Sequence, residues 1–231
     1  MTVWPSTIHD EAEWKRILDE LCKPIPARGL LQTKEARERW TIGHALHASP
    51  GLFGARFPSE IRHGDAPDFV LRYGQRIVGV EVVEAIPCEL AHAYAVVNRS
   101  DDGSDRFPSV LSFSDFRSDE VRKTQAEVIE TACDFSGSEP WLGDEPERHW
   151  VDFVSRAICR KIQKQKTGNY SSVSELHLLI ADEVGGPANV DKAWQRLVDN
   201  ERLMADAASS FAAIHVLSQR MVHSIPFRRS C

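Results

Sequence analysis

Residues 67–84, PDFVLRYGQRIVGVEVVE, predict two β-strands joined by a tight turn. A glycine-glutamine pair at positions 74 and 75 separates two runs rich in β-branched and aromatic residues, which is typical of a two-residue hairpin loop. Counting outward from this loop pairs Tyr73 with Arg76 and places Asp68 opposite Glu81. A three-residue loop would shift the register by one and separate the two acids, so this juxtaposition depends on the turn.

The residues around the two acids are apolar on both faces of the predicted hairpin. Val70, Ile77 and Val83 share the face of the acids, and a further set of valines and aromatic residues forms the other. Opposed like charges destabilise a strand pair, and a buried charge without compensation is very costly. Asp68 and Glu81 therefore require a cation, shared protons or basic partners, and a divalent metal would meet that need. The alternative is structural: an aspartate in a turn and a strand glutamate paired with an arginine.

Composition limits the classes of protein that fit this chain. The sequence has 231 residues and a formal net charge of -6, which suits a single α/β domain whose overall field repels nucleic acid. Any site for a polyanion must therefore be local. Five scattered cysteines without zinc-site spacing favour reduced thiols and a cytoplasmic protein. The N-terminus resembles no export signal, and no apolar stretch approaches the ~18 residues of a membrane span, so no membrane association is expected.

The spacing of apolar residues predicts an order of elements along the chain. Periods near 3.6 indicate helices and short apolar runs indicate buried strands, while glycine and proline mark loops. The expected elements are a helix from Asp10 to before Pro24, a helix over 33–48, a short strand within 51–66, the hairpin, an insertion or flexible loop over 88–117, a helix over 118–133, a loop over 137–147, a helix over 151–166, a strand over 175–181, a helix over 190–205 and a strand over 211–218.

The Pro67-Asp68 pair, the strand turn and the Glu81-Val82-Val83 run resemble the PD-(D/E)XK, or restriction-endonuclease-like, nucleases. The order of elements is similar as well. The resemblance implies a central mixed β-sheet flanked by helices in αβββαβ order, with extra helices and a terminal strand. It divides the chain into an N-terminal helical extension (1–32), a nuclease-like core (33–87 and 151–182), an insertion (88–150) and a C-terminal helix and strand (183–231).

The resemblance also implies the roles of individual residues. Asp68 and Glu81 would hold Mg²⁺ or Mn²⁺, and a glutamate of the preceding helix, Glu35 or Glu38, would complete the coordination or orient water. Where the family has a lysine two residues after the second acid, this chain has Val83.

The helix predicted over 151–166 offers a replacement for that lysine, since the amine has migrated to a neighbouring element in some family members. Lys161 or Lys164 would take its place. The expected nucleic-acid contacts from this helix are Arg156, Arg160, Lys164 and Lys166. The alternative for this cationic run is an ordinary solvated helix face.

Two functions of different classes follow from these residues. The first is a Mg²⁺-dependent nuclease that hydrolyses phosphodiester bonds, with DNA as the expected substrate. The second is a catalytically inactive relative that serves as a binding or assembly module, with Val83 marking the loss of the catalytic lysine. The resemblance also implies a possible protein partner or assembly as a homodimer. The position of Lys161 and Lys164 relative to Asp68 and Glu81 distinguishes the two functions.

Overall fold

The structure is a computed structural model that describes residues 7–25, 33–54, 57–86, 88–100, 143–168, 170, 173–183 and 189–227, together with residues 124, 126, 127 and 130. Its helices are α1 (Glu11–Leu21), α2 (Lys34–Ala48), α3 (Cys88–Ser100), α5 (Glu145–Thr167), α6 (Val190–Val198) and α7 (Glu201–Ser210). Its strands are β1 (Glu60–His63), β2 (Phe69–Tyr73), β3 (Arg76–Ala85), β4 (Glu175–Asp182), β5 (Ala213–Ser218) and β6 (Met221–Pro226).

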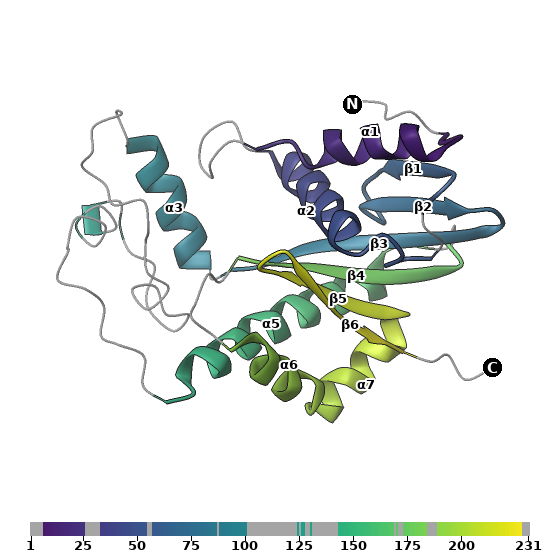
Figure 1. Cartoon of the computed structure of the whole chain (residues 1–231). Helices are drawn as coiled ribbons and strands as arrows, with labels where there is room; N and C mark the ends of the chain where they lie inside the picture. The colour runs from purple at the N-terminus through teal and green to yellow at the C-terminus, as the bar shows by residue number, and fades with distance from the viewer. Residues whose placement is uncertain are drawn as a thin grey trace.

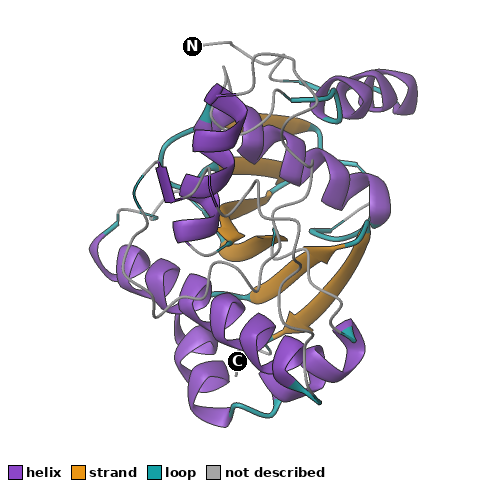
Figure 2. Cartoon of the chain, turned by 90° about the vertical axis from the view of Figure 1, so that its left-hand side faces the viewer, coloured by secondary structure: helices purple, strands orange, loops and turns teal. Residues whose placement is uncertain are grey.

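The six strands form one mixed sheet in the order β1-β2-β3-β4-β5-β6. Strands β1, β2 and β3 are an antiparallel meander, β4 and β5 run parallel to β3, and β6 is antiparallel to β5. Helices α1 and α2 lie on one side of this sheet, while α5, α6 and α7 lie on the other (Figure 1), and the helices surround the strands in the turned view (Figure 2). The α/β class, with a mixed sheet flanked by helices, is confirmed.

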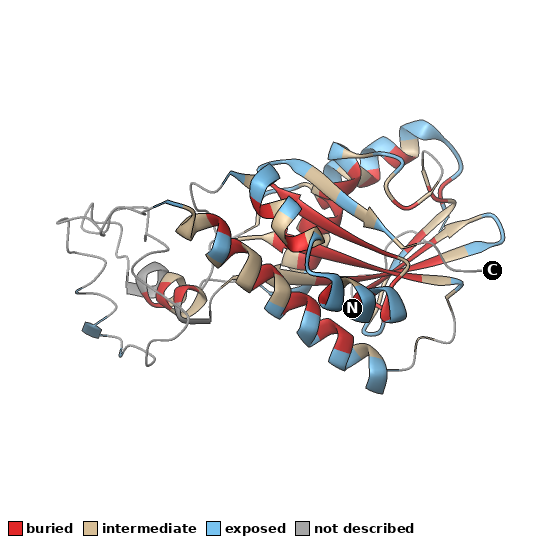
Figure 3. Cartoon of the chain, turned by 90° about the horizontal axis from the view of Figure 1, so that it is seen from below, coloured by how far each residue is buried: buried red, intermediate tan, exposed pale blue. Residues whose placement is uncertain are grey.

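Both faces of the sheet are buried, and the strands are largely red in the burial view (Figure 3). One core cluster includes Trp14 of α1, Ile42 of α2 and Phe53, and the other includes Trp150 and Ile158 of α5. A strand that is covered on both faces needs apolar side chains at nearly every position, which accounts for the continuous run ELHLLIAD of β4.

The hairpin has the predicted register. Tyr73 pairs with Arg76 and Val70 with Gly79, and the ladder continues to Phe69 opposite Val80. Gly74 adopts φ +64°, a conformation that glycine reaches without steric cost. The two-residue loop is therefore confirmed, and Asp68 and Glu81 are the next residues outward.

The two N-terminal helices match their predictions. Asp10 caps α1 by accepting a hydrogen bond from the backbone N–H of Glu13 at 2.8 Å, and Thr33 caps α2 through the N–H of Ala36 at 3.2 Å. Such caps satisfy backbone donors that have no partner within the helix.

Three elements differ from the prediction. Helix α5 begins at Glu145 rather than at position 151, because the proline at 146 lies in the first turn, where its missing N–H costs nothing. The helix predicted over 190–205 is two helices, since the first ends at Val198 with Asp199 as its C-cap, and Asn200 caps the second by accepting the N–H of Leu203. The C-terminal segment also has a second strand, β6, which the sequence pattern did not predict.

The insertion predicted over 88–150 is not simply a loop. Its first residues form α3, in which Leu90, Ala93 and Val96 are buried at a spacing of three and join the core cluster that contains Trp150. An alanine-rich segment with this spacing is compatible with a helix, but its apolar stripe is too short to establish a period. Residues 101–117, and nearly all of the helix predicted over 118–133, lie outside the described residues. Among the helices that the structure describes, none has the length and apolarity to cross a membrane.

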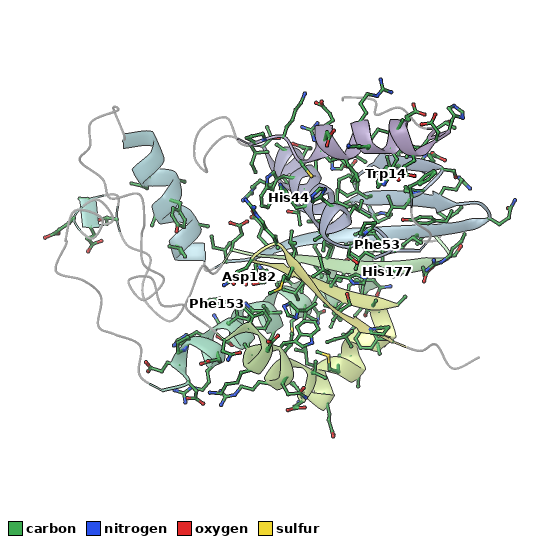
Figure 4. The ribbon with its side chains drawn as sticks, in the orientation of Figure 1. Trp14, His44, Phe53, Phe153, His177 and Asp182 are labelled. Atoms are coloured by element: carbon green, nitrogen blue, oxygen red, sulfur yellow. The ribbon has the colours of Figure 1, made fainter. Side chains whose placement is uncertain are left out.

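Two histidines are buried together on the α2 side of the sheet. His177 Nδ1 lies 2.9 Å from His215 Nε2, and His215 Nδ1 lies 2.8 Å from the Ser224 hydroxyl. The ring of Phe53 meets both imidazoles edge-on, and Phe53 and His177 are labelled in Figure 4. Burial, with a smaller contribution from His177, lowers the pKa of His215 to about 3.

The buried imidazole makes stability fall in acid. An unfolded histidine binds a proton below about pH 6.5, whereas folded His215 stays neutral down to about pH 3. Between these values the unfolded state binds more protons, so the free energy of unfolding is expected to decrease as pH falls, by up to about 1.4 kcal/mol per pH unit. Urea unfolding at several pH values measures this slope. His215→Asn is expected to flatten it, and an unchanged slope in that variant would contradict the assignment.

Candidate functional site

Asp68 and Glu81 lie side by side on the face of the sheet that α5 covers. Asp68 directly precedes β2, and Glu81 is in register with Leu178 of β4, which belongs to the core beneath α5. Their exposed fractions are 0% and 1%, so both carboxyl groups are withdrawn from water. Two acids at this depth require compensation within the protein.

Lys161 of α5 supplies that compensation directly. Its ammonium nitrogen lies 3.0 Å from Asp68 Oδ2 and also donates to Glu81 Oε2. Lys161 is itself only 8% exposed, which is rare for a lysine without a charged partner. Lys164, one turn further along the helix, donates to Glu81 Oε2 at 3.1 Å. The two lysines predicted as replacements for the missing motif lysine are therefore both brought to the carboxylate pair.

The two oxygens of Asp68 have different surroundings. Oδ2 accepts the backbone N–H of Val82 at 2.7 Å in addition to the Lys161 ammonium. Burial would raise the pKa of Asp68, but the Lys161 ammonium and the Val82 N–H outweigh it and hold the pKa below its ordinary value. Oδ1 is buried and accepts no hydrogen bond from the described residues. The ammonium nitrogens of Lys34 and Lys164 lie 3.6 and 4.0 Å from it.

A third acid, Glu38, reaches this site from α2. Glu38 is 5% exposed, and its Oε1 lies 2.8 Å from the ammonium of Lys34. Its other oxygen, Oε2, lies 2.9 Å from His63 Nε2 of β1. The hydrogen bond with Glu38 and the nearby Asp68 raise the pKa of Lys34, although partial burial opposes this shift. Lys34 thus lies between Glu38 and Asp68, at 2.8 and 3.6 Å, as Lys161 lies between Asp68 and Glu81, but it approaches Asp68 less closely than Lys161 does.

A pocket of about 230 Å³ opens beside this group between α2, β3 and α5. Lys34, Arg37 and Glu38 line it from α2, and Lys161 lines it from α5. The part of β3 that contributes to the wall extends beyond the end of β2. The site is therefore open to a ligand on the side of the α2 lysine and arginine.

Tyr170 also belongs to this group, although the sequence did not single it out. Its hydroxyl donates to Glu81 Oε1 at 3.0 Å, so Glu81 is held through both of its oxygens. Burial and the adjacent Glu81 carboxylate raise the pKa of Tyr170, which keeps the hydroxyl protonated as a donor.

Removing this hydroxyl gives a measurable effect. Tyr170→Phe is expected to lower the free energy of unfolding by about 1–2 kcal/mol, because a buried carboxylate oxygen loses its donor. Tyr73→Phe is the matched control, since the Tyr73 hydroxyl is buried but has no hydrogen-bond partner among the described residues. Chemical denaturation of both variants tests the difference, and equal stabilities would contradict the role assigned to Tyr170.

The other predicted residues are more dispersed. Glu35 is exposed in the first turn of α2, where hydrogen bonds with its own backbone N–H and the Thr33 hydroxyl lower its pKa. Arg156 pairs with Asp152 at 2.8 Å on the outer side of α5. Arg160 donates to the backbone oxygen of Glu84 at 3.3 Å, which places it at the edge of the site. Lys166 is exposed near the end of α5.

The charges of the site balance. Glu84 points to the opposite face from Glu81, and its carboxylate pairs with Arg37 of α2 at 2.5 Å. One ion-pair network joins three acids to three bases, and the Arg37–Glu84 pair lies beside it, so that the formal charges of these eight side chains sum to zero: Glu38, Asp68 and Glu81 with Lys34, Lys161 and Lys164 form the network. Burial of these carboxylates is tolerated because each one has a cationic neighbour.

The donor set can be tested against a divalent cation. Within the described ranges, no group of three or more His, Cys, Asp and Glu side chains is arranged to hold a metal ion. Mg²⁺ in phosphoryl-transfer sites commonly takes only one or two protein carboxylates and completes its shell with water and substrate phosphate. Asp68 and Glu81 provide two carboxylates in contact with one ammonium, and Asp68 Oδ1 has an unused lone pair. This pair fits such an ion.

Comparison with known protein families, with curated proteins and with solved structures finds no match to this chain.

Proposed function

We propose that this protein is a metal-dependent nuclease of the PD-(D/E)XK type that hydrolyses phosphodiester bonds in DNA. The observation that carries the proposal is the position of Lys161, whose ammonium contacts both Asp68 and Glu81 from the neighbouring helix. A lysine beside two carboxylates is the combination that the chemistry needs. The strand position of the family's lysine is occupied by Val83, and Lys161 brings an ammonium group to the two acids from the helix instead.

The order of elements supports the same proposal. Helix α2 is followed by β1, β2 and β3, and then, after α3, by α5 and β4. The two acids lie on β3 and immediately before β2, the amine lies on α5, and a further glutamate lies on α2. The proposed core thus spans 33–87 and 151–182. The fold alone does not define an activity, so the proposal depends on the side chains.

The residues of the site have distinct proposed roles. Asp68 and Glu81 would hold Mg²⁺ or Mn²⁺, which supplies a water of lowered pKa and stabilises negative charge on the phosphate. Lys161 neutralises charge that develops during attack, and Lys164 contacts a phosphate oxygen. Glu38 is positioned by His63 to accept a hydrogen bond from water. Arg160 and Lys166 extend the cationic side of α5 along the nucleic-acid backbone.

The charge balance also supports a second candidate function. A site in which four bases already neutralise four acids is also what an inactive binding or assembly module would keep to preserve its fold. In that case the lysines are structural counter-ions. The two candidates differ in whether Mg²⁺ changes the behaviour of the protein toward DNA.

Plasmid cleavage distinguishes the two candidates. Wild-type protein is expected to nick or linearise supercoiled plasmid with Mg²⁺ or Mn²⁺ and to lose this activity in EDTA. Lys164→Ala is expected to lower the rate about 10-fold or more, because it removes the ammonium group that is proposed to contact a phosphate oxygen. The fold is expected to be preserved, because this side chain is 42% exposed and contributes little to the core. The control is Lys192→Ala, an exposed lysine on α6. Intact plasmid under all metal conditions would favour the binding module.

A further inference from the structure

Two lysines occupy positions between pairs of carboxylates. Lys161 lies between Asp68 and Glu81, and Lys34 lies between Glu38 and Asp68. Asp68 is common to both pairs and uses a different oxygen for each, Oδ2 toward Lys161 and Oδ1 toward Lys34. The ammonium groups therefore neutralise the same carboxylates that a divalent cation would use.

Either ligand alone meets competition in such a site. A metal ion that approaches the carboxylates has to displace ammonium groups, and these would be left near a new positive charge. A phosphate that approaches the lysines has to compete with the carboxylates, which would then lose their counter-ions. The zero net charge of the network means that neither ligand is attracted by an excess of opposite charge.

When both ligands are bound, each one compensates the charges that the other leaves without a counter-ion. A bound metal ion would take over part of the carboxylate charge and release the two exposed ammonium groups, those of Lys34 and Lys164, and the phosphodiester would take these ammonium groups as its own partners. We propose that divalent metal and a phosphodiester bind this site as a coupled pair by this exchange of partners. The inference rests on the proposed function, since it takes phosphodiester as the ligand, and it adds that neither ligand occupies the site well alone.

The exposure of the three lysines shows which of them exchange. The side chains of Lys34 and Lys164 are 66% and 42% exposed, whereas that of Lys161 is 10% exposed. A lysine ammonium on a flexible stem can move to a phosphate when its head already reaches water. Lys34 and Lys164 thus change partners, one from α2 and one from α5, while Lys161 stays with the acids. The pocket of about 230 Å³, lined by both Lys34 and Lys161, provides space for the phosphate.

Coupling of this kind is reciprocal and can be measured in both directions. The probes are Mn²⁺ and a short DNA duplex with phosphorothioate linkages, which resist hydrolysis. Calorimetry gives the Mn²⁺ affinity with and without the duplex, and fluorescence anisotropy gives the duplex affinity with and without Mn²⁺. Each ligand is expected to raise the affinity of the other about 10-fold or more, by the same factor in both directions.

The exchanging lysines give the specific variants. In the Lys34→Met/Lys164→Met double variant, Mn²⁺ alone is expected to bind more tightly than to wild type, because two competing ammonium groups are gone. The coupling factor is expected to fall to about 3-fold or less. Each single variant gives an intermediate value, and Lys192→Met on α6 is the control for loss of one exposed lysine. Both replaced side chains are well exposed, so folding is expected to be preserved.

The outcomes separate this inference from the proposed nuclease activity. Mn²⁺ affinity that the duplex does not change would overturn the exchange, and so would a lack of Mn²⁺ binding under both conditions. Wild-type coupling that persists in the double variant would also overturn it. Coupling without cleavage of a natural duplex supports the exchange and contradicts the nuclease, whereas cleavage without coupling does the reverse.

Discussion

Asp68→Asn is expected to abolish Mn²⁺ binding and to lower plasmid cleavage at least about 100-fold. Asparagine keeps the size of the side chain but removes the charge that Asp68 contributes to both lysine-bridged pairs. It also replaces one carboxylate oxygen with an amide NH₂, which is a donor and cannot hold a cation. Calorimetry of Mn²⁺ in the presence of duplex and the rate of plasmid conversion measure the two effects on the same samples.

Two further variants make the result for Asp68 specific. Glu81→Gln is expected to act in the same direction, since Glu81 is the other carboxylate in contact with Lys161. Asp206→Asn changes an exposed aspartate of α7 in the same chemical way and is expected to leave binding and cleavage unchanged. An Asp68→Asn protein that is folded and binds Mn²⁺ with wild-type affinity would remove Asp68 from the metal site.

The hairpin could be predicted from the sequence because its register has two independent signals. The Gly74-Gln75 loop defines the pairing from one end, and the apolar pattern of both strands defines it along their length. A slip by one residue would have moved Asp68 and Glu81 to different faces, so agreement of the two signals was decisive. The approach of the acids therefore followed from local information.

The burial of Lys161 could be predicted from its spacing to the apolar residues of the helix, although not from the pattern of charges alone. Lys161 follows Ile158 by three residues and Val154 by seven, so it lies on the buried stripe of α5. A lysine on an apolar stripe requires an acid opposite, and the only acids predicted in an apolar setting were Asp68 and Glu81. Arg156 lies on the outer side of the same helix and pairs locally with Asp152.

The remaining residues depend on contacts between distant elements. Lys34, His63 and Tyr170 come from α2, β1 and the segment before β4, and nothing in their local sequence marks them for one site. Strand β6 was missed for a similar reason: the segment MVHSIP has no alternation of buried and polar residues, and pairing with β5 determines its conformation. Tertiary packing supplies this information.

Lys161→Met is expected to lower the free energy of unfolding by about 3–5 kcal/mol in the absence of metal. Methionine fills much of the same space, so the effect comes from the lost charge rather than from a cavity. Asp68 and Glu81 would then be two buried like charges whose nearest cations are the more exposed Lys34 and Lys164. Urea denaturation in EDTA measures the change.

A double-mutant cycle assigns the cost to the contact between Lys161 and Asp68. If repulsion between unpaired acids causes the loss, Lys161→Met combined with Asp68→Asn is expected to be more stable than Lys161→Met alone, because one of the two charges is removed. Mn²⁺ is expected to stabilise Lys161→Met more than wild type, since the ion restores positive charge between the acids.

The stability of the single variant Lys161→Met also tests whether Lys34 and Lys164 alone neutralise the two acids. If Lys161→Met were as stable as Lys192→Met, then Lys34 and Lys164 would suffice to neutralise both acids, and Lys161 would not be the principal counter-ion. The proposed division of roles, in which Lys161 stays with the acids while the two exposed lysines move to phosphate, requires the larger loss.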